Sequence, residues 1–592
     1  QPITAFPHLE QSPLAGRSNQ DGKLPQPEKK LREAICVLLV ELCERFTFFG
    51  IVCNMIHFCT VKLGYRNYQA AMANMCFVGT SMLTPVLVGW IAECLVGRIK
   101  LVCICMFLHF LGTALLPVVS FPFEDIYIDR RHVLHTLPKR EQKIVFYFAL
   151  LTASLGIGGI RAIVCPLSAY NLEDCGPKEL LSFFNWFYWL VNLNSAVVFV
   201  SISYIQQSVA RNLGFLIPFV SGIMAIITIH MMRGEMIYKP KAESSLLTTF
   251  GVIGSALRTR CVWHRYLSTG VTNWLDHAKE NHGGQYSEIQ VESTKSLTRL
   301  FPLFTFQILY RTCVMQIPSG YYLQTMNSNL HFSGFVFPIA AMNVISIVPL
   351  LILVPVLECI NSSCLFSSKD TGHSPTIYIG HLSAALSVMV AGFSEIHRKH
   401  FPQVEQTLSE EVLLVSSMPC FHLAPQYILL GVAEALVTPS CKIRGISMHF
   451  LALFNGAGCF MGPCLLLQGK LILLQMSTLP GNWFPHLLHE GKLERFFFFL
   501  ASLMMVNTLG FWTIAHRYVK LHAKVYQSFK TNRQGCFSKC SIWDSNTKLM
   551  ESFVRSEHCR NFINLAPAHS EISVKGSIGL VLTLEEAAFH MV

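Results

Sequence analysis

The sequence predicts an all-α polytopic membrane protein whose chain crosses the bilayer about twelve times. Of its 592 residues, 52% are hydrophobic and only 14% are charged, whereas soluble domains carry about a quarter charged residues. Apolar runs of roughly the 20 residues that one crossing needs recur along most of the chain. A polar segment at 233–299 separates six such runs from six more.

The first six spans are expected where apolar runs follow one another between short polar connections. They lie at 33–60, 69–92, 99–121, 144–169, 183–206 and 213–232. The first begins after the basic stretch that ends at Arg32, and the sixth ends where Arg233 restores charge. We therefore expect a cytoplasmic N-terminal segment at 1–32 and a six-helix bundle at 33–232.

Six further spans follow the central cytoplasmic linker at 233–299. They are expected at 300–326, 332–357, 376–394, 412–437, 446–475 and 496–514. A C-terminal six-helix bundle would then occupy 300–518, with a cytoplasmic tail at 519–592. Two six-helix halves joined by a long loop are the layout of the major facilitator fold, in which the halves rock about a central site.

Basic residues gather in the N-terminal segment, the loop after the second span, the linker and the tail. Because positive charge favours the cytoplasmic side, both ends are expected inside, although the basic residues at 122–143 do not fit this count. The net charge of +11 does not indicate nucleic-acid binding, since no basic-aromatic motif accompanies it. The 21 cysteines lie mostly in apolar spans without metal-ligand spacing, so neither a metal nor a cofactor is expected.

The beginning of the chain carries two expectations of its own. The first residue is Gln1 rather than Met, so the natural start is expected further upstream. The residues before Glu33 are polar and contain several prolines, and they therefore do not predict a cleavable signal peptide.

The first span contains three ionisable residues within five positions, in the stretch ELCERFTFFG. Glu41, Glu44 and Arg45 stand at i, i+3 and i+4 and therefore share one face of a helix. Glu41 can pair with Arg45, which leaves Glu44 to find another cation or to take up a proton. The stretch predicts a proton site within the membrane. A structural ion pair near a helix end is the alternative.

ExxERF in this span resembles the signature of the proton-coupled oligopeptide transporter family. GWIAECLVGRIK at 89–100 resembles the loop after the second helix of major facilitator proteins. GIGGIRA at 156–162 resembles the GxGGIK motif in the fourth helix of the same transporter family. FFNWFYWLVNLNS at 183–195 and PQYILLGVAE at 425–434 resemble segments of the fifth and tenth helices. The resemblance spans roughly 32–518 and is nearest to the peptide/histidine transporter branch of solute carrier family 15.

The resemblance implies a proton-coupling group formed by ExxER and a cation of the fourth helix. Glu41, Glu44 and Arg45 match the first part, and Arg161 matches the cation. Arg161 would then be the missing partner of Glu44, and protonation of one acid would free a guanidinium or let the two helices separate. An Arg161 that only stabilises helix packing is the alternative.

The resemblance also implies a substrate site. Tyr188 and Asn192 match helix-five residues that touch the peptide backbone in relatives, and their i, i+4 spacing puts them on one face. Gln316 matches a glutamine near the site, and Glu434 matches the acid that receives the amino terminus of the peptide. For Tyr188, Gln316 and Glu434, ordinary packing and polar contact between helices is the alternative.

Several family positions carry different residues in this chain. Two tyrosines and an arginine that follow ExxER in relatives are replaced by Phe48, Phe49 and Val52. The other departures are Met75 for a proton-linked histidine, Met315 for an aspartate, Leu451 for a tryptophan, and Tyr170 and Asn171 for Asp-Gln. Capture of a substrate carboxylate would therefore have to rely on Arg161 and Asn192, or be weak.

The segment after Glu434 is about ten residues shorter than the resemblance implies. Only nine residues precede Arg444, and Pro439 lies among them. About ten helical residues cover the roughly 15 Å from the midplane of a bilayer to its surface. We expect either that the eleventh helix begins deep in the bilayer or that the sequence is a splice or gene-model variant.

These features predict a proton-coupled symporter of di- or tripeptides, or of histidine, that works by alternating access. Its partners would be the solute, protons and the lipid bilayer, and it would act as a monomeric carrier in the plasma membrane or an endolysosomal membrane. Catalysis is not expected, because GxSxG, Walker and HExxH motifs are absent. The alternatives are a non-transporting nutrient sensor or scaffold, and a carrier of a different small solute.

Overall fold

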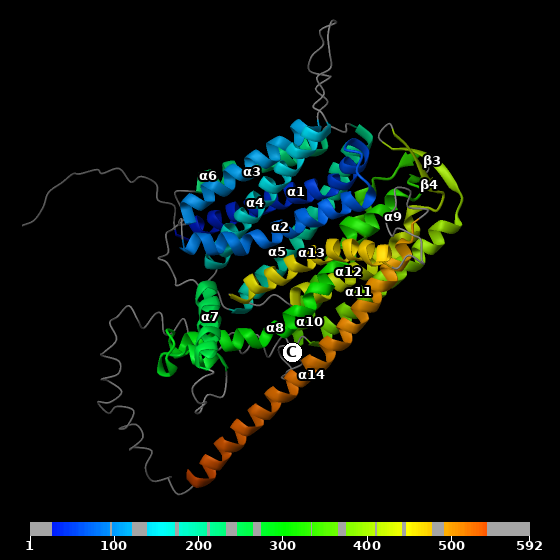
Figure 1. Cartoon of the computed structure of the whole chain (residues 1–592). Helices are drawn as coiled ribbons and strands as arrows, with labels where there is room; N and C mark the ends of the chain where they lie inside the picture. The colour runs from blue at the N-terminus through cyan, green and yellow to red at the C-terminus, as the bar shows by residue number, and fades with distance from the viewer. Residues whose placement is uncertain are drawn as a thin grey trace, which may run out of the picture.

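The fold consists of two layers of long helices, seen in a computed structural model of the chain (Figure 1). The structure describes residues 26–94, 98–120, 139–171, 177–209, 213–232, 245–263, 274–332, 334–364, 374–408, 411–440, 446–475 and 491–540. The segments coloured blue to cyan lie together in one layer, and those coloured green to orange form the second layer beside it.

Within the described ranges, the N-terminal layer contains six helices. They are α1 (Gln26–His57), α2 (Asn67–Cys94), α3 (Arg98–Ser120), α4 (Lys139–Asn171), α5 (Pro177–Tyr204) and α6 (Leu213–Met232). A π-helical turn extends α1 at η1 (Phe58–Lys62) and α5 at η3 (Ile205–Val209). Each predicted N-terminal span coincides with one helix to within several residues.

The C-terminal layer also contains six long helices. They are α8 (Glu288–Val314), α10 (Asn343–Cys364), α11 (Ser374–His400), α12 (Ala424–Ser440), α13 (Ile446–Gln475) and α14 (Leu493–Cys540). The seventh predicted span does not continue as one helix to residue 326. It breaks after α8 into the π-helical turn η6 (Ile317–Tyr321), which contains Pro318, and the short helix α9 (Tyr322–Met326).

The predicted spans at 332–357 and 412–437 begin too early, because antiparallel hairpins and 3₁₀ turns occupy their first residues. β1 (His331–Phe332) pairs with β2 (Phe335–Val336), and β3 (Gln403–Leu408) pairs with β4 (Glu411–Ser416). The 3₁₀ turns η7 (Ile339–Met342) and η8 (Cys420–Leu423) then lead into α10 and α12. A short apolar run has the same hydropathy in a strand as in a helix, so hydropathy could not separate the two.

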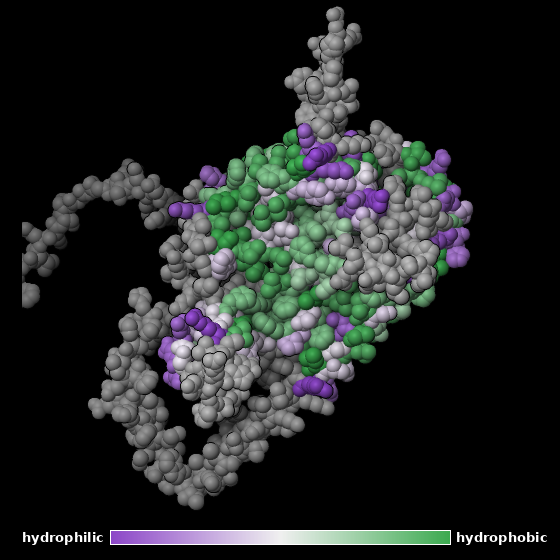
Figure 2. All heavy atoms as spheres, in the orientation of Figure 1, coloured by the Kyte–Doolittle hydropathy of each residue, from purple (hydrophilic) through white to green (hydrophobic). Residues whose placement is uncertain are grey.

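Among the described residues, nine helices are long and apolar enough to cross a membrane. Helix α1 is not one of these nine, because polar side chains interrupt its apolar sequence. Large apolar side chains such as Phe107, Met231 and Val506 are exposed on the helices. Figure 2 shows apolar residues over much of the visible face, with hydrophilic residues gathered towards its ends. This distribution suits a protein surrounded by lipid.

The tenth span is short, as its sequence suggests. Helix α12 has 17 residues, about 26 Å at the helical rise, against a hydrocarbon core of about 30 Å. Pro439 does not end it, because the helix continues to Ser440. Arg444 lies outside the described residues, so both alternatives, a deep start of the eleventh helix and a splice or gene-model variant, stay predictions.

The two layers meet where α2 packs against α13 and α5 against α10, and several hydrogen bonds join them near one end. The Asn74 side chain on α2 donates to the Pro318 carbonyl at 2.8 Å, and the Tyr322 hydroxyl on α9 donates to the Cys53 carbonyl at 3.4 Å. Gln207, at the end of α5, donates to the Phe337 carbonyl at 3.1 Å and accepts from the Ile339 amide at 3.1 Å. These contacts lie beside the start of α10.

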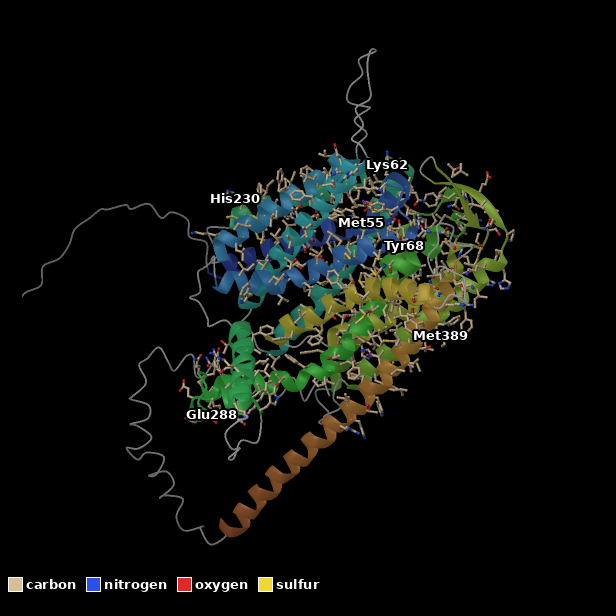
Figure 3. The ribbon with its side chains drawn as sticks, viewed as in Figure 1. Met55, Lys62, Tyr68, His230, Glu288 and Met389 are labelled. Atoms are coloured by element: carbon tan, nitrogen blue, oxygen red, sulfur yellow. The ribbon has the colours of Figure 1, made fainter. Side chains whose placement is uncertain are left out.

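Labelled residues in Figure 3 show at which end of the molecule these hydrogen bonds between the layers lie. Lys62, Tyr68 and Met389 lie towards the joined end, whereas His230 and Glu288 lie at the other end. The linker helix α7 (Ser245–Trp263) is also at the far end from these contacts (Figure 1). If the linker is cytoplasmic, as the charge distribution predicts, the joined end faces away from the cytoplasm.

Glycines allow α4 to pack closely against α2 and α3. A Cβ atom on Gly156 would lie 2.3 Å from the His109 backbone nitrogen, and one on Gly112 would lie 2.2 Å from the backbone nitrogen of Ala153. Gly158 faces α2, where a Cβ would lie 2.5 Å from the Cβ of Thr84. Because real Cβ atoms do not approach other atoms so closely, the GIGGIRA motif fixes the position of α4.

The linker contains more regular structure than its polar sequence predicts. Between α7 and α8 lie the 3₁₀ turns η4 (Trp274–Ala278) and η5 (Glu280–His282). Apolar side chains of α7, η4 and α8 form a small core, made of Val252, Ala256, Leu275, Ala278 and Val291. Ser287 caps α8 by accepting from the Gln290 amide, and the Gln290 side chain bonds back to the Ser287 amide. This capping box starts α8 before the expected boundary.

An ion network covers this small core. Asp276 accepts from Lys295 at 2.5 Å and pairs with Lys279 at 3.1 Å, and Glu292 lies 2.8 Å from Lys279 and 2.7 Å from Lys295. Burial alone would raise the pKa of Asp276, but the bonds from Lys295 and Lys279 outweigh it and lower that pKa. The Glu292 carboxylate raises the pKa of Lys279 above its ordinary value.

We expect Gly156→Ala to weaken the packing of α3 against α4 and to lower the stability by about 1–3 kcal/mol. The thermal transition of the detergent-solubilised protein, followed by size-exclusion chromatography, measures this. Gly254→Ala on α7 is the control, because no atom lies within 4 Å of its Cβ position. Equal transitions for the two variants would contradict the close approach of α3 and α4.

We expect Asp276→Asn to loosen the linker, because it removes the carboxylate that both lysines contact. Since folding lowers the pKa of Asp276, the stability from its charge is present above its ordinary pKa of 3.8 and is lost as the pH falls through the lowered value. Hydrogen exchange of η4 and the start of α8 should rise about tenfold at pH 7, which corresponds to about 1.4 kcal/mol.

Glu280→Gln is the matched control for this experiment, because Glu280 is an exposed acid of the same segment. Its exchange should equal that of the unmodified chain. The ion network would have no stabilising role if Asp276→Asn also exchanged at the unmodified rate.

Candidate functional site

One turn of α1 presents the three ionisable residues of ELCERFTFFG on a single face. The Arg45 Nε donates to Glu41 Oε1 at 3.0 Å, and Arg45 Nη2 lies 2.9 Å from the same oxygen. Arg45 Nε also lies 3.6 Å from Glu44 Oε2. Glu41 and Glu44 are 2% and 0% exposed. The helix therefore holds two buried acids beside one cation.

Arg161 of α4 provides the second cation. Its Nε donates to both carboxylate oxygens of Glu44, at 3.0 and 3.1 Å, and its Nη2 lies 2.9 Å from Glu44 Oε1. The residue is 6% exposed. Its guanidinium carbon lies 4.4 Å from the centre of the Phe48 ring, a distance at which a ring face attracts a cation. Phe48, which departs from the resemblance, thus covers the pair.

Part of the hydrogen-bonding capacity of this group is unused. Among the described residues, Glu41 Oε2 and Arg161 Nη1 are buried without a hydrogen-bond partner. The two acids and two guanidinium groups balance in charge, but a buried pair is costly as soon as one member loses its partner. Loss of either charge of the Glu44–Arg161 pair would therefore leave the other charge buried without its main partner.

Hydrogen bonds from α5 and α6 fix the charged turn of α1. Asn194 donates to the Leu42 carbonyl at 3.0 Å, and Ser221 donates to the Cys43 carbonyl at 3.0 Å. Thr47 donates to the Pro218 carbonyl at 3.1 Å. Sequence reasoning did not identify Asn194 or Ser221, because a single polar residue in an apolar span gives no indication of its partner.

Glu434, on α12, lies near a cation that the sequence analysis did not identify. Arg311 Nη1 on α8 is 3.9 Å from Glu434 Oε1, and the two side chains are 19% and 25% exposed. Tyr188 of α5 lies close enough to interact electrostatically with both charges. The only signal in the sequence was a lone arginine in the run ILYRTCVM, which could equally have been a packing residue.

Tyr188 and Asn192 share one face of α5, as their spacing predicts. The Asn192 side chain donates to the Tyr188 carbonyl at 2.8 Å. The neighbouring Trp189 donates from its indole to the Leu351 carbonyl of α10 at 2.9 Å. Tyr188 itself packs against a small core made of Leu350, Val354 and Ala435. This part of α5 therefore lies against the C-terminal layer, and Tyr188 and Glu434 come together there.

Gln316 is not brought to this group by any described contact. It is 1% exposed, and its side chain donates to the Thr312 carbonyl of the preceding turn at 3.1 Å. Its amide oxygen lies against Gly320. In this structure the packing alternative therefore describes Gln316 better than a place in a substrate site.

Arg161 and Asn192, which were expected to capture a substrate carboxylate or to do so only weakly, already have partners in this structure. Arg161 contacts Glu44 through its Nε and Nη2, and the Asn192 amide donates to its own helix, so capture of a carboxylate by these two residues stays a prediction. The replaced family positions do not supply another cation. Five of them are buried in one apolar core and Phe49 packs against it; the five are Phe48, Val52, Met75, Met315 and Leu451. The side chains of Tyr170 and Asn171 lie outside the described part.

Residues 99–448 match the family model described as PTR2: POT family. The chain belongs to the POT family. It is 58% identical over 506 residues to human solute carrier family 15 member 5, and the match covers 83% of this chain and 86% of the human protein. Within the described residues, no cluster of histidine, cysteine and acidic side chains could hold a metal.

Solved structures of POT proteins share the fold. One, described as an auto-inhibited POT family peptide transporter, superposes with a TM-score of 0.61 at 16% identity, covering 82% of this chain and 97% of the other. A second, a POT family transporter in complex with 5-aminolevulinic acid, gives a TM-score of 0.56 at 14% identity, with coverages of 81% and 95%. Because the chain belongs to the POT family and has several helices of membrane-spanning length among its described residues, it is a multi-pass membrane transporter and not an enzyme.

We expect Arg161→Met to lower the stability by about 3–5 kcal/mol, because it leaves Glu44 buried without its main partner. Adding Glu44→Gln should recover most of this loss, since the double variant buries no unpaired charge. Thermal transitions of the single and double variants in detergent at neutral pH test this. A double variant no more stable than Arg161→Met would show that the two residues are not energetically coupled.

Proposed function

We propose that this POT family member is a proton-coupled symporter of small zwitterionic solutes, namely di- or tripeptides or histidine, that works by alternating access. The observation that carries the proposal is the buried bond between Glu44 of α1 and Arg161 of α4. A carboxylate that is 0% exposed and paired with a guanidinium changes the energy of helix packing when it binds a proton.

The coupling step begins with the proton on Glu44. The neutral carboxyl no longer attracts Arg161 as an ion, so the guanidinium either moves to the free Glu41 Oε2 or separates from α1. Because α1 also contacts η6 of the C-terminal layer, a shift between α1 and α4 changes how the two layers meet. Return of the proton to the lower-concentration side restores the pair and completes the cycle.

The solute would bind at the group formed by Tyr188 and Glu434, where α5 meets the C-terminal layer. Glu434 would receive an ammonium group, which an intramembrane carboxylate attracts strongly in a low-dielectric setting. Tyr188 and Asn192 would line the same site from α5. A POT relative that binds 5-aminolevulinic acid, itself a small zwitterion, supports this class of solute.

A non-transporting sensor or scaffold is the second candidate. It is favoured by the apolar residues at Phe48, Val52 and Met75, all of which are buried, because they replace polar residues of relatives. Retention of the complete group of Glu41, Glu44, Arg45 and Arg161 favours transport. We place the carrier, as a monomer, in the plasma membrane or an endolysosomal membrane.

We expect Glu44→Gln to abolish uphill uptake but to leave exchange intact, because exchange needs no net proton movement. Radiolabelled histidine and dipeptides are to be measured in proteoliposomes with an imposed pH gradient, and then in counterflow without one. Arg66→Gln, an exposed loop variant, is the control and should retain both activities.

The outcomes separate the candidate functions. Equal loss of uptake and exchange in Glu44→Gln would assign Glu44 a structural role. Gradient-driven accumulation by that variant would remove Glu44 from coupling. Binding without any transport by the unmodified chain would favour the sensor.

A further inference from the structure

Arg311 and Glu434 form an ion pair that is loose for its position. The distance between Arg311 Nη1 and Glu434 Oε1 is 3.9 Å, longer than the 2.7–2.9 Å of a charge-assisted hydrogen bond. No hydrogen bond between the two is present in the described part of the chain, and Arg311 Nε is buried there without a partner. The Arg311 side chain also hydrogen-bonds to Cys459, so its Nε is the donor that remains unused.

The pair lies where a solute can meet it. Arg311 comes from α8 and Glu434 from α12, while Tyr188 approaches both from α5 of the other layer. The side chains are 19% and 25% exposed, in contrast to the fully buried ion pair of Glu395 and Arg398 on α11. The Glu395 pair is saturated by hydrogen bonds, including one from Gln324 at 3.0 Å, and is therefore structural.

We propose that Arg311 and Glu434 together form the receptor for a single amino-acid zwitterion, with the ammonium on Glu434 and the carboxylate on Arg311. This rests on the proposed transport function and names its solute class. The zwitterion would lie antiparallel to the pair, so that four charges alternate in sign around a ring. Each protein charge then gains a hydrogen-bonded partner that it lacks in the pair alone.

The spacing of the pair favours a short solute over a peptide. In one amino acid the ammonium nitrogen and the carboxyl carbon are about 2.5 Å apart, which is comparable to the 3.9 Å of the pair. Each added residue can move these groups apart by up to about 3.5 Å. A dipeptide would therefore require Arg311 and Glu434 to separate by several ångströms before both of its ends could bind.

Arg311 also supplies a cation in place of the arginine that relatives carry at the position of Val52. Val52, which stands where relatives carry arginine, is 6% exposed and belongs to the apolar core. Arg161 is engaged with Glu44 at 2.9–3.1 Å. Among these three positions only Arg311 combines a positive charge, partial exposure and proximity to Glu434.

The test is equilibrium binding to the full-length protein in lipid nanodiscs without a pH gradient. The probes are L-histidine, L-histidine methyl ester, Nα-acetyl-L-histidine and glycyl-L-histidine, in competition with radiolabelled histidine. For the unmodified chain we expect histidine to bind at least tenfold more tightly than each of the other three. Arg66→Gln, with its exposed arginine, should show the same order.

Variants then assign each end of the solute. Arg311→Gln should weaken the binding of histidine and leave the binding of the methyl ester nearly unchanged. The dissociation constant of the ester divided by that of histidine should then fall to about two or less. Arg311→Lys keeps the positive charge, and its ratio should stay above that value. Glu434→Gln should lower the dissociation constant of Nα-acetyl-histidine divided by that of histidine to about two or less. Where Arg311→Gln does not fold, Arg311→Lys and Glu434→Gln carry the test.

The proposal is overturned if glycyl-histidine binds the unmodified chain as tightly as histidine, if no probe binds, or if Arg311→Gln weakens histidine and its ester equally. These failures differ from failure of the proposed function. A chain that accumulates dipeptides under a pH gradient but does not prefer histidine refutes only this inference. A chain that transports none of the solutes refutes the symporter.

Discussion

Glu44 and Arg161 carry opposite charges into the apolar interior of the N-terminal layer, where neither could remain charged alone. Their ion pair joins α1 to α4, and the other helices of the layer contact these two. Gly156 and Gly158 bring α4 close to α3 and α2, while Asn194 and Ser221 hold the charged turn of α1 against α5 and α6. A proton on Glu44 therefore acts on several helix contacts at once.

The second charged pair, Arg311 with Glu434, differs from the first in exposure and geometry. Glu44 is fully buried and bonded through both oxygens, whereas Glu434 is partly exposed and 3.9 Å from its cation. Apolar residues, among them Val52 and Met75, fill the core where relatives carry polar groups. This difference is the basis of our proposal that the first pair takes up a proton and the second binds a small zwitterion.

Much of the fold could be predicted from the sequence, because apolar runs of bilayer length predict membrane-spanning helices. Helices α1 to α6 coincide with such runs. The β1–β2 and β3–β4 hairpins could not be separated from helix by hydropathy. The face shared by Glu41, Glu44 and Arg45 follows from helical spacing, and the resemblance supplied Arg161. Arg311 was not predicted, because the distance from α8 to α12 is set by the packing of helices far apart in the chain.

We propose that solute and proton enter together, the proton on Glu44 and the solute at the group of Tyr188, Arg311 and Glu434. The most direct measurement is the internal pH of proteoliposomes, reported by a trapped dye, when histidine is added outside at zero membrane potential and equal starting pH. We expect the lumen to become more acidic when histidine is added, and we expect no such change with Glu44→Gln. Entry of labelled histidine with no change in internal pH would contradict it.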